Sequence, residues 1–512
     1  MKFGLEVQVI ENIISVLEQH PKVDKGFVFG SRAKGNYRPD SDIDIAIKGN
    51  EITTDDIIAI SVAIETIGIT HKFDLIDYNS IKEPALKEHI DRVGIVFYSV
   101  WQKTKIGILP TDWKLMTLDE IKSKEKKAII SGPFGSNISS QYFVTNGVPV
   151  IRGNNLSLGL GKKFNDDGFV FITEEKANEL GTWAVKEDII FTAVGTIGQV
   201  GILLGNEKYE KYIISNKQLR LRVDKEIVSP LFAYYWFASP AMIDTIEQRN
   251  TGSSVPLINL SVLKSLYVPI PPKWEQNLIV QTLGSLDNKI DLLHRQNKTL
   301  EQLAETLFRQ WFVEEAEESW EIVKLEKLGK IICGKTPSKK IADFFNGDIP
   351  FIKIPDMHGK TFVFDSVDSL TEKGLNSQLN KTIPPKSICV SCIATVGLVV
   401  MNAKTSQTNQ QINSIIPAKD IYRYFIYLKM LTMKDDLLAM ASGGTATDNL
   451  NTGDFSKIDI LLPNENQLKN FHETVNPLFE KIYTNQTQIS TLTQARDTLL
   501  PKLMSGEVRV EM

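Results

Sequence analysis

The sequence predicts an α+β protein that consists of a small α/β domain, two similar mixed α/β domains and two long helices forming an antiparallel coiled coil. Three observations support this prediction. The first hundred residues contain a Gly-Ser turn followed by closely spaced acidic residues, the remaining chain repeats one order of strands and loops, and each repeat ends in a long heptad pattern. Shared landmarks separated by variable segments are typical of two structurally similar domains.

Length and composition describe an ordinary globular chain. The 512 residues, 42% apolar and 23% charged, allow roughly three or four domains. Three cysteines cannot form a disulfide framework and the first residues lack a signal peptide, so we expect a cytoplasmic protein. No stretch has the length and apolarity of a membrane-spanning helix, so no membrane partner is expected. A net charge of −4 argues against coating nucleic acid by bulk charge but allows a local basic groove.

Residues 1–101 are predicted to form the small α/β domain. One apolar strand is expected just before a sharp turn at Gly30 and Ser31, and a second apolar strand carries Asp42 and Asp44. Alternate residues of a strand face the same side, so these two carboxylates project together. Because adjacent carboxylates repel each other, they are expected to have a cation between them.

This acidic pattern predicts a magnesium site for phosphoryl transfer. Asp74 lies on the next apolar strand and can supply a third carboxylate, either as a metal ligand or as the base for an attacking hydroxyl. The predicted catalytic and metal-binding residues are Asp42, Asp44 and Asp74. Backbone amides of the turn can hold nucleotide phosphates, and the predicted nucleotide-binding residues are Gly30, Ser31 and Arg32.

The Gly-Ser turn, the Asp-x-Asp pair, the distal Asp and the closing stretch 94–98 resemble the minimal nucleotidyltransferase domains of the DNA polymerase β superfamily, the kind paired with HEPN toxins as antitoxins. The resemblance implies magnesium-dependent transfer of a nucleotide from a nucleoside triphosphate to a hydroxyl. The alternative is a fold retained for protein contact without catalysis.

Residues 105–274 and 319–464 are predicted to form the two similar domains. Both contain stretches rich in β-branched residues and glycine, as expected of strands joined by tight turns. The aligned landmarks are 188–198 with 387–397, at an offset of 397 − 198 = 199, then 215–218 with 408–411, and 252–271 with 444–463. Two similar domains can bind two similar ligands at a fixed separation, which is the arrangement of a protein that recognises a bipartite target.

Small polar loops and amide or basic side chains in both copies suggest contact with DNA. Glycine-containing loops allow backbone amides to approach phosphates, and Arg, Lys, Asn and Gln are the side chains that contact base edges. The candidate DNA-binding residues are Arg152, Asn154, Lys217, Gln218, Gly252 and Ser253 in the first copy, and Lys353, Asn409, Gln411, Gly444 and Thr445 in the second. For each residue the alternative is an ordinary turn or a structural role.

Residues 275–314 and 465–504 are predicted to form the two long helices. Apolar residues recur in both at alternating spacings of four and three, which is a heptad seam roughly 50 Å long. The polar members of these seams are Asn297, Asn485 and Arg496. A whole domain separates the helices, which favours antiparallel pairing, and Pro477 is expected to start a new segment or kink the second helix.

From about residue 105 to residue 512 the chain resembles the specificity subunit of a type I restriction-modification system. The motifs that carry the resemblance are, in chain order, 109–113, 268–276, 306–312, 319–321 and 499–507. The resemblance implies a non-catalytic reader of double-stranded DNA in which two target-recognition domains each bind one half of a split recognition sequence. It also implies that the paired helices set the spacer and dock methyltransferase (M) subunits, while restriction (R) subunits translocate and cleave. S-adenosylmethionine and ATP would then act only through these partner subunits.

Two functions therefore compete. The first is the DNA sequence-specificity subunit of a type I restriction-modification system with an additional nucleotidyltransferase-like domain. The second is a magnesium-dependent, antitoxin-like nucleotidyltransferase whose C-terminal region targets it to DNA or to partners. The length of chain covered and the double set of landmarks favour the first function. The sequence contains no Gly-x4-Gly-Lys-(Ser/Thr) phosphate loop, so catalysis on DNA would come from other subunits.

Overall fold

The structure is a computed structural model that describes residues 3–442 and 448–510. The chain folds into two compact units, one of residues 1–286 with 494–512 and one of residues 287–493. The division falls inside both long helices, so each unit contains one end of each helix. The five segments predicted from the sequence are finer than this division, and their boundaries stay predictions.

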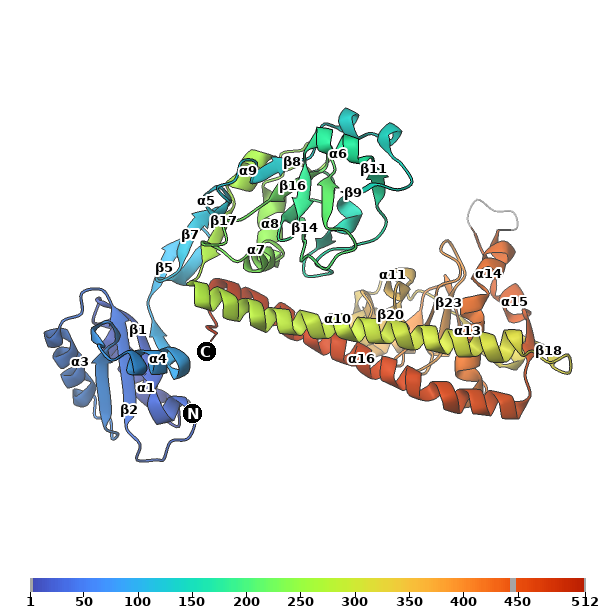
Figure 1. Ribbon diagram of the computed structural model, residues 1–512. Coiled ribbons are helices and arrows are strands. Elements are labelled where there is room, and N and C mark those ends of the chain that lie inside the picture. The colour runs from blue at the N-terminus through green and yellow to red at the C-terminus, as the bar shows by residue number, and fades with distance from the viewer. Residues whose placement is uncertain (1–2, 443–447, 511–512) are drawn as a thin grey trace. The chain divides into compact units, whose positions relative to one another are not determined.

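The N-terminal domain is a four-stranded sheet with helices packed against it (Figure 1). Its elements are α1 Val7–Glu18, β1 Val23–Phe29, α2 Gly30–Ala33, β2 Ile43–Gly49, α3 Thr54–Thr66, β3 Phe73–Asp77, α4 Pro84–Val93 and β4 Ile95–Ser99. The sheet order is β3-β2-β1-β4, with β2 and β3 parallel and the other neighbours antiparallel. Ile43, Ile45 and Ile47 of β2 are fully buried, so the alternation of this strand directs Asp44 to the other face. A hairpin of β5 Trp101–Thr104 and β6 Gly107–Pro110 follows.

Lobe 1, residues 114–270, contains two sheets and a separate strand pair. Its strands are β7 Lys114–Thr117, β8 Ile129–Ser131, β9 Val148–Ile151, β10 Ser157–Leu158, β11 Val170–Ile172, β12 Trp183–Val185, β13 Ile189–Thr192, β14 Gln199–Ile202, β15 Lys211–Ile214, β16 Gln218–Leu221 and β17 Tyr267–Ile270. Its helices are α5 Leu118–Ile121, α6 Glu174–Leu180, α7 Pro230–Phe237, α8 Pro240–Gln248 and α9 Leu260–Lys264. The sheets have the orders β10-β14-β13-β16-β8 and β11-β9-β15-β12, and β7 pairs with β17.

Lobe 2, residues 321–462, has the same plan. Its strands are β18 Glu321–Lys324, β19 Gly329–Cys333, β20 Phe345–Ile352, β21 Phe362–Val363, β22 Ser369–Leu370, β23 Ile388–Ser391, β24 Val399–Asn402, β25 Gln407–Thr408, β26 Ile412–Pro417 and β27 Asp459–Leu462. Its helices are α11 Ile354–Met357, α12 Glu372–Asn376, α13 Arg423–Thr432, α14 Lys434–Ala441 and α15 Thr452–Ser456. The sheets have the orders β21-β24-β23-β26-β19 and β22-β20-β25, and β18 pairs with β27.

The two lobes agree in strand order and in register, which confirms the predicted pseudo-repeat. Thr192 pairs with Gln218 across β13 and β16, and Ser391 pairs with Ile412 across β23 and β26. The central pair of the second sheet is parallel in both lobes, β9 with β15 and β20 with β25. The lobes differ at two edges. In the first sheet β10 is antiparallel to β14 whereas β21 is parallel to β24, and the second sheet has a fourth strand, β12, in lobe 1.

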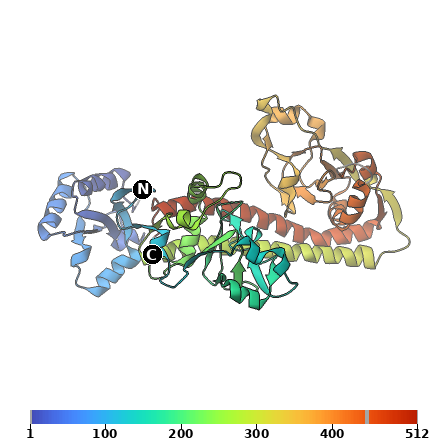
Figure 2. The ribbon, with the colours of Figure 1, turned by 90° about the horizontal axis from the view of Figure 1, so that it is seen from above.

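Two long helices, α10 Lys273–Arg309 and α16 Glu465–Ser505, run side by side in both views (Figures 1 and 2). In the first unit, Ile279 near the start of α10 shares a core with Leu503 near the end of α16. In the second unit, Phe308 near the end of α10 packs edge-on against Phe471 near the start of α16, with ring centroids 6.1 Å apart. The helices are therefore antiparallel, as predicted.

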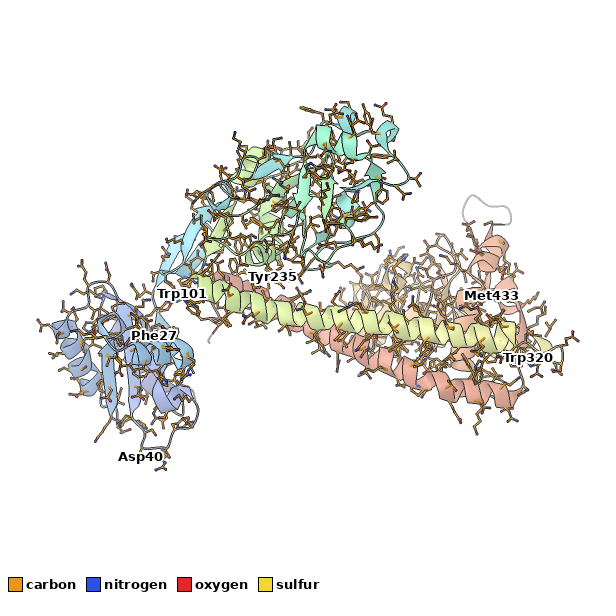
Figure 3. The ribbon with its side chains drawn as sticks, in the orientation of Figure 1. Phe27, Asp40, Trp101, Tyr235, Trp320 and Met433 are labelled. Atoms are coloured by element: carbon orange, nitrogen blue, oxygen red, sulfur yellow. The ribbon has the colours of Figure 1, made fainter. Side chains whose placement is uncertain are left out.

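The heptad seams face the interior of each unit. Asn297 and Asn485 are 5% and 0% exposed, and Asn485 Nδ2 donates to Asn297 Oδ1 at 2.9 Å. The prediction for Pro477 was wrong in part, because α16 continues through this residue as one helix. Met433 and Trp320, labelled in Figure 3, belong to the core that lobe 2 shares with its ends of the two helices.

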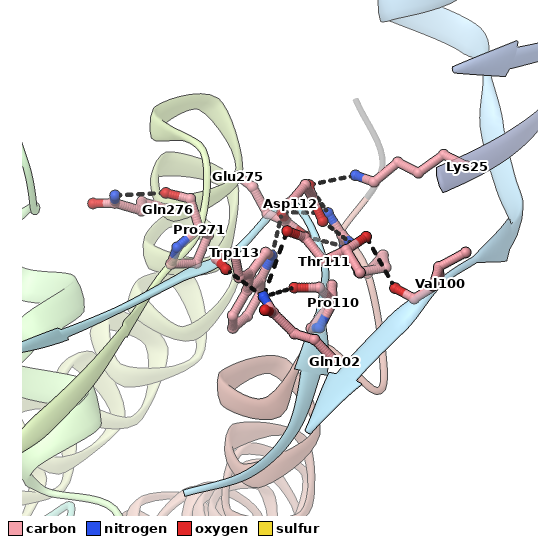
Figure 4. Close-up of polar contacts among 11 residues, drawn as sticks. Lys25, Val100, Gln102, Pro110, Thr111, Asp112, Trp113, Pro271, Glu275 and Gln276 are labelled. Atoms are coloured by element: carbon pink, nitrogen blue, oxygen red, sulfur yellow. Dashed lines mark hydrogen bonds and ion pairs between the residues drawn. The ribbon is translucent and has the colours of Figure 1, made fainter. Parts of the chain in front are cut away.

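A buried polar cluster connects the N-terminal domain with the start of lobe 1 inside the first unit (Figure 4). Lys25 Nζ donates to Asp112 Oδ2 at 2.5 Å, and Arg509 Nη2 donates to the same oxygen at 3.1 Å. Arg509 also donates to both carboxylate oxygens of Glu275, which accepts from Trp113 Nε1 at 3.0 Å. Each buried cation thus meets a carboxylate, which offsets the cost of removing the charges from water.

Candidate functional sites

The acidic site of the N-terminal domain lies on neighbouring strands. The register of β2 and β3 places Asp44 beside Asp74, and Asp42 immediately precedes β2. Gly30 begins α2 with φ of +71°, and a Cβ at this position would lie 1.9 Å from Asp44 Oδ2. The turn therefore requires glycine, both for its left-handed backbone and for its close approach to the carboxylate.

The electrostatics of this site agree with a cluster of carboxylates. Burial raises the pKa of Asp44, and the negative charges of Asp74 and Asp42 raise it further, while Arg32 and His89 oppose the shift. Carboxylate oxygens are hard donors that suit Mg²⁺. In the part of the chain that the structure describes, no three His, Cys, Asp or Glu side chains are placed to hold a metal. The residue types fit a divalent cation, and binding would require the carboxylates to converge.

Arg32 supports the loop that precedes β2. Its side chain is 2% exposed, and its guanidinium donates to the backbone carbonyls of Ser41 at 2.6 Å, Asp42 at 3.1 Å and Phe3 at 3.1 Å. These hydrogen bonds use most of the donors that a nucleotide phosphate would need. The structure therefore gives Arg32 a positioning role, and Ser31 beside it is half-buried at the start of α2.

His89 is a neighbour of the acidic site that the sequence patterns did not identify. It lies on α4, is half-buried, and interacts electrostatically with Asp44. Burial lowers its pKa, and the nearby cations Lys34 and Arg92 lower it further. No sequence signal placed α4 over this edge of the sheet, because the contact depends on tertiary packing alone.

In both lobes, candidate DNA-binding residues follow the central parallel strands. Arg152 directly follows β9 and Lys353 directly follows β20, so the two basic residues occupy equivalent places. Their backbone amides both donate at 2.9 Å to a buried acceptor three residues later, Asn155 and Asp356. Both basic residues therefore lie at the carboxyl end of one strand of a parallel pair.

The loops after β15 and β25 lie beside these basic residues. Ser215 N donates at 3.0 Å to the carbonyl of the last residue of β9, and Asn409 N donates at 3.2 Å to that of β20. The equivalent residues are therefore 215–218 and 409–412, so the sequence alignment of this step was wrong by one residue. The shift makes exposed Lys217 equivalent to half-buried Gln411.

The loop that contains Gly252 and Ser253 joins the same edge of lobe 1. Ala193 N donates to Lys217 O at 2.7 Å, and Ile258 N donates to Ala193 O at 2.9 Å. These two hydrogen bonds connect the base of the 252–253 loop with Lys217. The loops that follow β9, β13 and β15 and the loop of residues 252–253 are therefore connected at one edge of lobe 1.

Comparisons with known proteins cover both parts of the chain. Residues 110–302 and 317–494 match the family model described as the type I restriction modification DNA specificity domain. The chain belongs to this specificity-domain family. Residues 11–102 match the model described as polymerase beta nucleotidyltransferase, so the N-terminal domain has the predicted family resemblance.

Individual specificity subunits resemble the chain over most of their length. The HindI specificity subunit of Haemophilus influenzae is 35% identical over 399 residues, which cover 63% of this chain and 87% of that protein. The MjaIX specificity subunit of Methanocaldococcus jannaschii is 27% identical over 444 residues, which cover 80% and 97%. The crystal structure of a type I restriction-modification S subunit from M. genitalium has a TM-score of 0.50 at 17% identity, covers 78% of this chain and 96% of that one, and shares the fold.

Membership of the specificity-domain family favours the first of the two predicted functions over the targeted-enzyme alternative. It also agrees with the paired lobes and helices. Among the described residues, no helix has the length and apolarity needed to cross a membrane. The three cysteines are free, with Cys389 and Cys392 buried and Cys333 half-buried.

The structure assigns two of the candidate DNA-binding side chains of this specificity domain to loop support. Gln218 is 1% exposed and accepts a hydrogen bond from Ser215 Oγ, and Asn409 is 6% exposed and donates to Gln411 Oε1 at 2.8 Å. The side-chain amides of Gln218 and Asn409 support the loops after β15 and β25, whereas Lys217 faces solvent.

The other candidates lie at the surface or partly covered. Asn154 is exposed and shares the carbonyl of Gly168 with Arg152, at 3.3 Å and 3.4 Å. Lys353 is half-buried and forms an ion pair with Asp368. Gly444 and Thr445 lie outside the residues that the structure describes.

Proposed function

We propose that this chain is the DNA sequence-specificity subunit of a type I restriction-modification system and binds a split site in double-stranded DNA. The observation that carries the proposal is that two lobes of similar topology each gather basic and amide residues where two parallel strands end. Two such edges in one chain suit two half-sites separated by a fixed gap.

The lobes differ in the side chains that they present at these equivalent edges. Lobe 1 offers Arg152 and Lys217, whereas lobe 2 offers Lys353, paired with Asp368, and Gln411. Arginine and lysine favour guanine edges and phosphates, whereas glutamine favours adenine. The two half-sites are therefore expected to differ in sequence.

Partner subunits would supply the chemistry on DNA. The HindI and MjaIX relatives are specificity subunits, which supports docking of methyltransferase (M) and restriction (R) subunits on this chain. S-adenosylmethionine and ATP would be used only by those subunits, and the assembly would work in the cytoplasm.

Genome-wide methylation mapping tests this function. The chain is expressed with its methyltransferase partner, and every methylated base is mapped. A split motif with a constant gap is the expected result, and unsplit or scattered methylation would overturn the proposal. Lys217→Ala should weaken DNA binding and reduce its salt dependence by about one phosphate contact. The control Lys82→Ala removes an exposed lysine outside both lobes and should leave binding unchanged.

A second activity is proposed for the N-terminal domain, magnesium-dependent nucleotidyl transfer. The close approach of Gly30 to Asp44, with Asp74 on the next strand, supports it. An acceptor hydroxyl would form a bond to the α-phosphorus of a nucleoside triphosphate, pyrophosphate would leave, and Asp74 would take the hydroxyl proton. Magnesium, when bound by Asp42, Asp44 and Asp74, supplies neutralisation of the phosphate charge.

Labelled ATP and magnesium test this activity on the intact chain. Label should transfer to protein in the wild type and be lost in Asp42→Ala/Asp44→Ala. Asp40→Ala is a matched control, because Asp40 is an exposed acid of the same loop (Figure 3) and its loss should leave transfer intact. Absence of label in the wild type would favour a docking role without catalysis.

A further inference from the structure

Phe134 is an exposed aromatic side chain in the loop that follows β8 of lobe 1. It is 84% exposed, more than any other aromatic residue among the exposed large hydrophobics of the described chain. A phenylalanine stabilises a fold mainly when it is buried, so the fold gains little from this exposed residue. Single exposed apolar residues are common, and its significance depends on what surrounds it.

The loop that carries Phe134 is anchored to the proposed DNA-binding edge. Gly132 N donates to Gln218 O at 2.9 Å, and a Cβ on Gly132 would lie 1.8 Å from Ser215 O. Asn137 N donates to Phe134 O at 2.8 Å, which closes the turn. The loop backbone is therefore held against the segment after β15 while the aromatic ring stays in solvent.

The loop of Phe134 contacts the loop that carries the exposed cation Lys217. A Cβ on Gly135, next to Phe134, would lie 3.1 Å from Asn216 Nδ2, and Asn216 immediately precedes exposed Lys217. Ser215 in the same loop is bonded to the end of β9, directly before Arg152. An exposed apolar ring on a loop that borders basic loops suits the surface of a duplex, where phosphates flank stacked bases.

Lobe 2 has a polar residue at the equivalent position. Gly334 N donates to Ile412 O at 3.0 Å, just as Gly132 donates in lobe 1, and this makes Thr336 the counterpart of Phe134. Thr336 Oγ1 donates to Gln410 Oε1 at 2.8 Å. The exposed aromatic residue is thus a feature of lobe 1 alone and marks a difference between two otherwise equivalent edges.

We propose that Phe134 is a specificity-determining residue that inserts its ring against a base step of the half-site bound by lobe 1. This inference rests on the proposed DNA-binding function. Apolar wedges of this kind partly unstack flexible base steps, and they distinguish sequences by the cost of that deformation. The half-site of lobe 2 is read without such a wedge.

The test uses the full chain with its methyltransferase partner and a duplex that carries the mapped recognition site. Phe134→Ala should weaken binding to this duplex by about tenfold or more, as expected for loss of one base-contacting residue, and should change binding to a scrambled duplex less than twofold. Phe134→Leu keeps an apolar wedge and should recover most of the affinity. Ile108→Ala removes another exposed apolar side chain, 61% exposed in the β5–β6 hairpin, and should have no effect.

Single-base changes separate this inference from the proposed function. In the wild type, changes in either half-site should weaken binding, and failure of this result would overturn the proposed function itself. In Phe134→Ala, the penalty at one position of the lobe 1 half-site should disappear while all penalties in the other half-site remain. A 2-aminopurine placed at that position should brighten on binding of the wild type alone. Equal penalties and equal fluorescence in both proteins would overturn the role of Phe134.

Discussion

Gly30 is the residue on which the geometry of the acidic site depends most directly. Its φ of +71° is unfavourable for other residues, and an added Cβ would meet Asp44 Oδ2 at 1.9 Å. Gly30→Ala should therefore destabilise the N-terminal domain by about 1–3 kcal/mol and displace the Asp44 carboxylate, so that nucleotidyl transfer is lost. Thermal unfolding and the labelled-ATP assay measure the two effects.

Gly35→Ala is the matched control for this substitution. Gly35 has a φ of +74°, and nothing lies within 4 Å of an added Cβ. Gly35→Ala should lower the free energy of unfolding by about 1–2 kcal/mol, because alanine disfavours the left-handed backbone, and it should leave nucleotidyl transfer unchanged. Equal loss of transfer in both variants would show that backbone strain, and not the contact with Asp44, controls the site.

The three thiols should differ in reactivity because of burial. Burial raises the pKa of Cys389 to about 12 and the pKa of Cys392 to about 11, and the thiolate is the reactive form. At pH 8 one thiol per native chain, that of half-buried Cys333, should therefore react quickly. All three thiols should react after denaturation. Titration with a thiol-specific chromogenic reagent measures this, and Cys333→Ser should abolish the fast phase. Fast labelling of three native thiols would contradict the buried placement.

At the scale of elements, the buried Asn297–Asn485 pair is expected to fix the register of α10 against α16. The two amides are hydrogen-bonded to each other across the helices, so Asn485→Leu removes this hydrogen bond from buried Asn297. That loss should destabilise the second unit by about 1–3 kcal/mol. Replacing both residues by leucine should restore or exceed the original stability, because apolar seams pack without a polar penalty.

Hydrogen exchange of the two helices under denaturant measures this pair in a double-mutant cycle. The double leucine variant should also show more than one helix register by crosslinking, since a polar seam residue specifies alignment. A single variant as stable as the wild type would show that the amide pair contributes nothing.

Sequence patterns predicted the elements better than the side chains at the site. Heptad spacing identified most of the seam residues, because helical periodicity depends on local geometry, but it missed buried Phe308 and Phe479. The alignment after β15 failed by one residue, and in a strand one residue decides which face a side chain occupies. Gln218 was a candidate for DNA contact because of its amide side chain, and it is buried. Burial of this side chain depends on the tertiary packing of the sheets, which cannot be predicted from the local sequence.

The acidic site illustrates the same difference between local and tertiary information. Asp42 and Asp44 were predictable as a pair because Asp44 lies on β2 and Asp42 directly precedes this strand. The pairing of Asp44 with Asp74 could also be inferred from two successive apolar strands, and the register agrees. The burial of Arg32 and the approach of His89 were not predictable, since they depend on a loop and a helix folding over the sheet.

At the scale of the whole molecule, duplication gives one chain two similar readers. Each lobe repeats the same sheets, and the sequence between their shared landmarks varies. A fold that keeps its strands while its loops diverge can recognise two different half-sites without changing how either lobe packs on its helices. The N-terminal domain lies outside this repeat, and its contact through Lys25 and Asp112 involves residues that precede lobe 1.

The length of the paired helices should set the gap between the two half-sites. Inserting four residues, about one turn, after Lys289 in α10 and after Thr491 in α16 would lengthen the pair by about 6 Å. Since base pairs are stacked about 3.4 Å apart, the gap in the methylated motif should grow by about one or two base pairs while both half-sites keep their sequences. Methylation mapping of the variant measures this change. An equal insertion in the turn at Lys105 of the β5–β6 hairpin should leave the gap unaltered, and an unaltered gap in the helix variant as well would show that the helices do not act as the spacer.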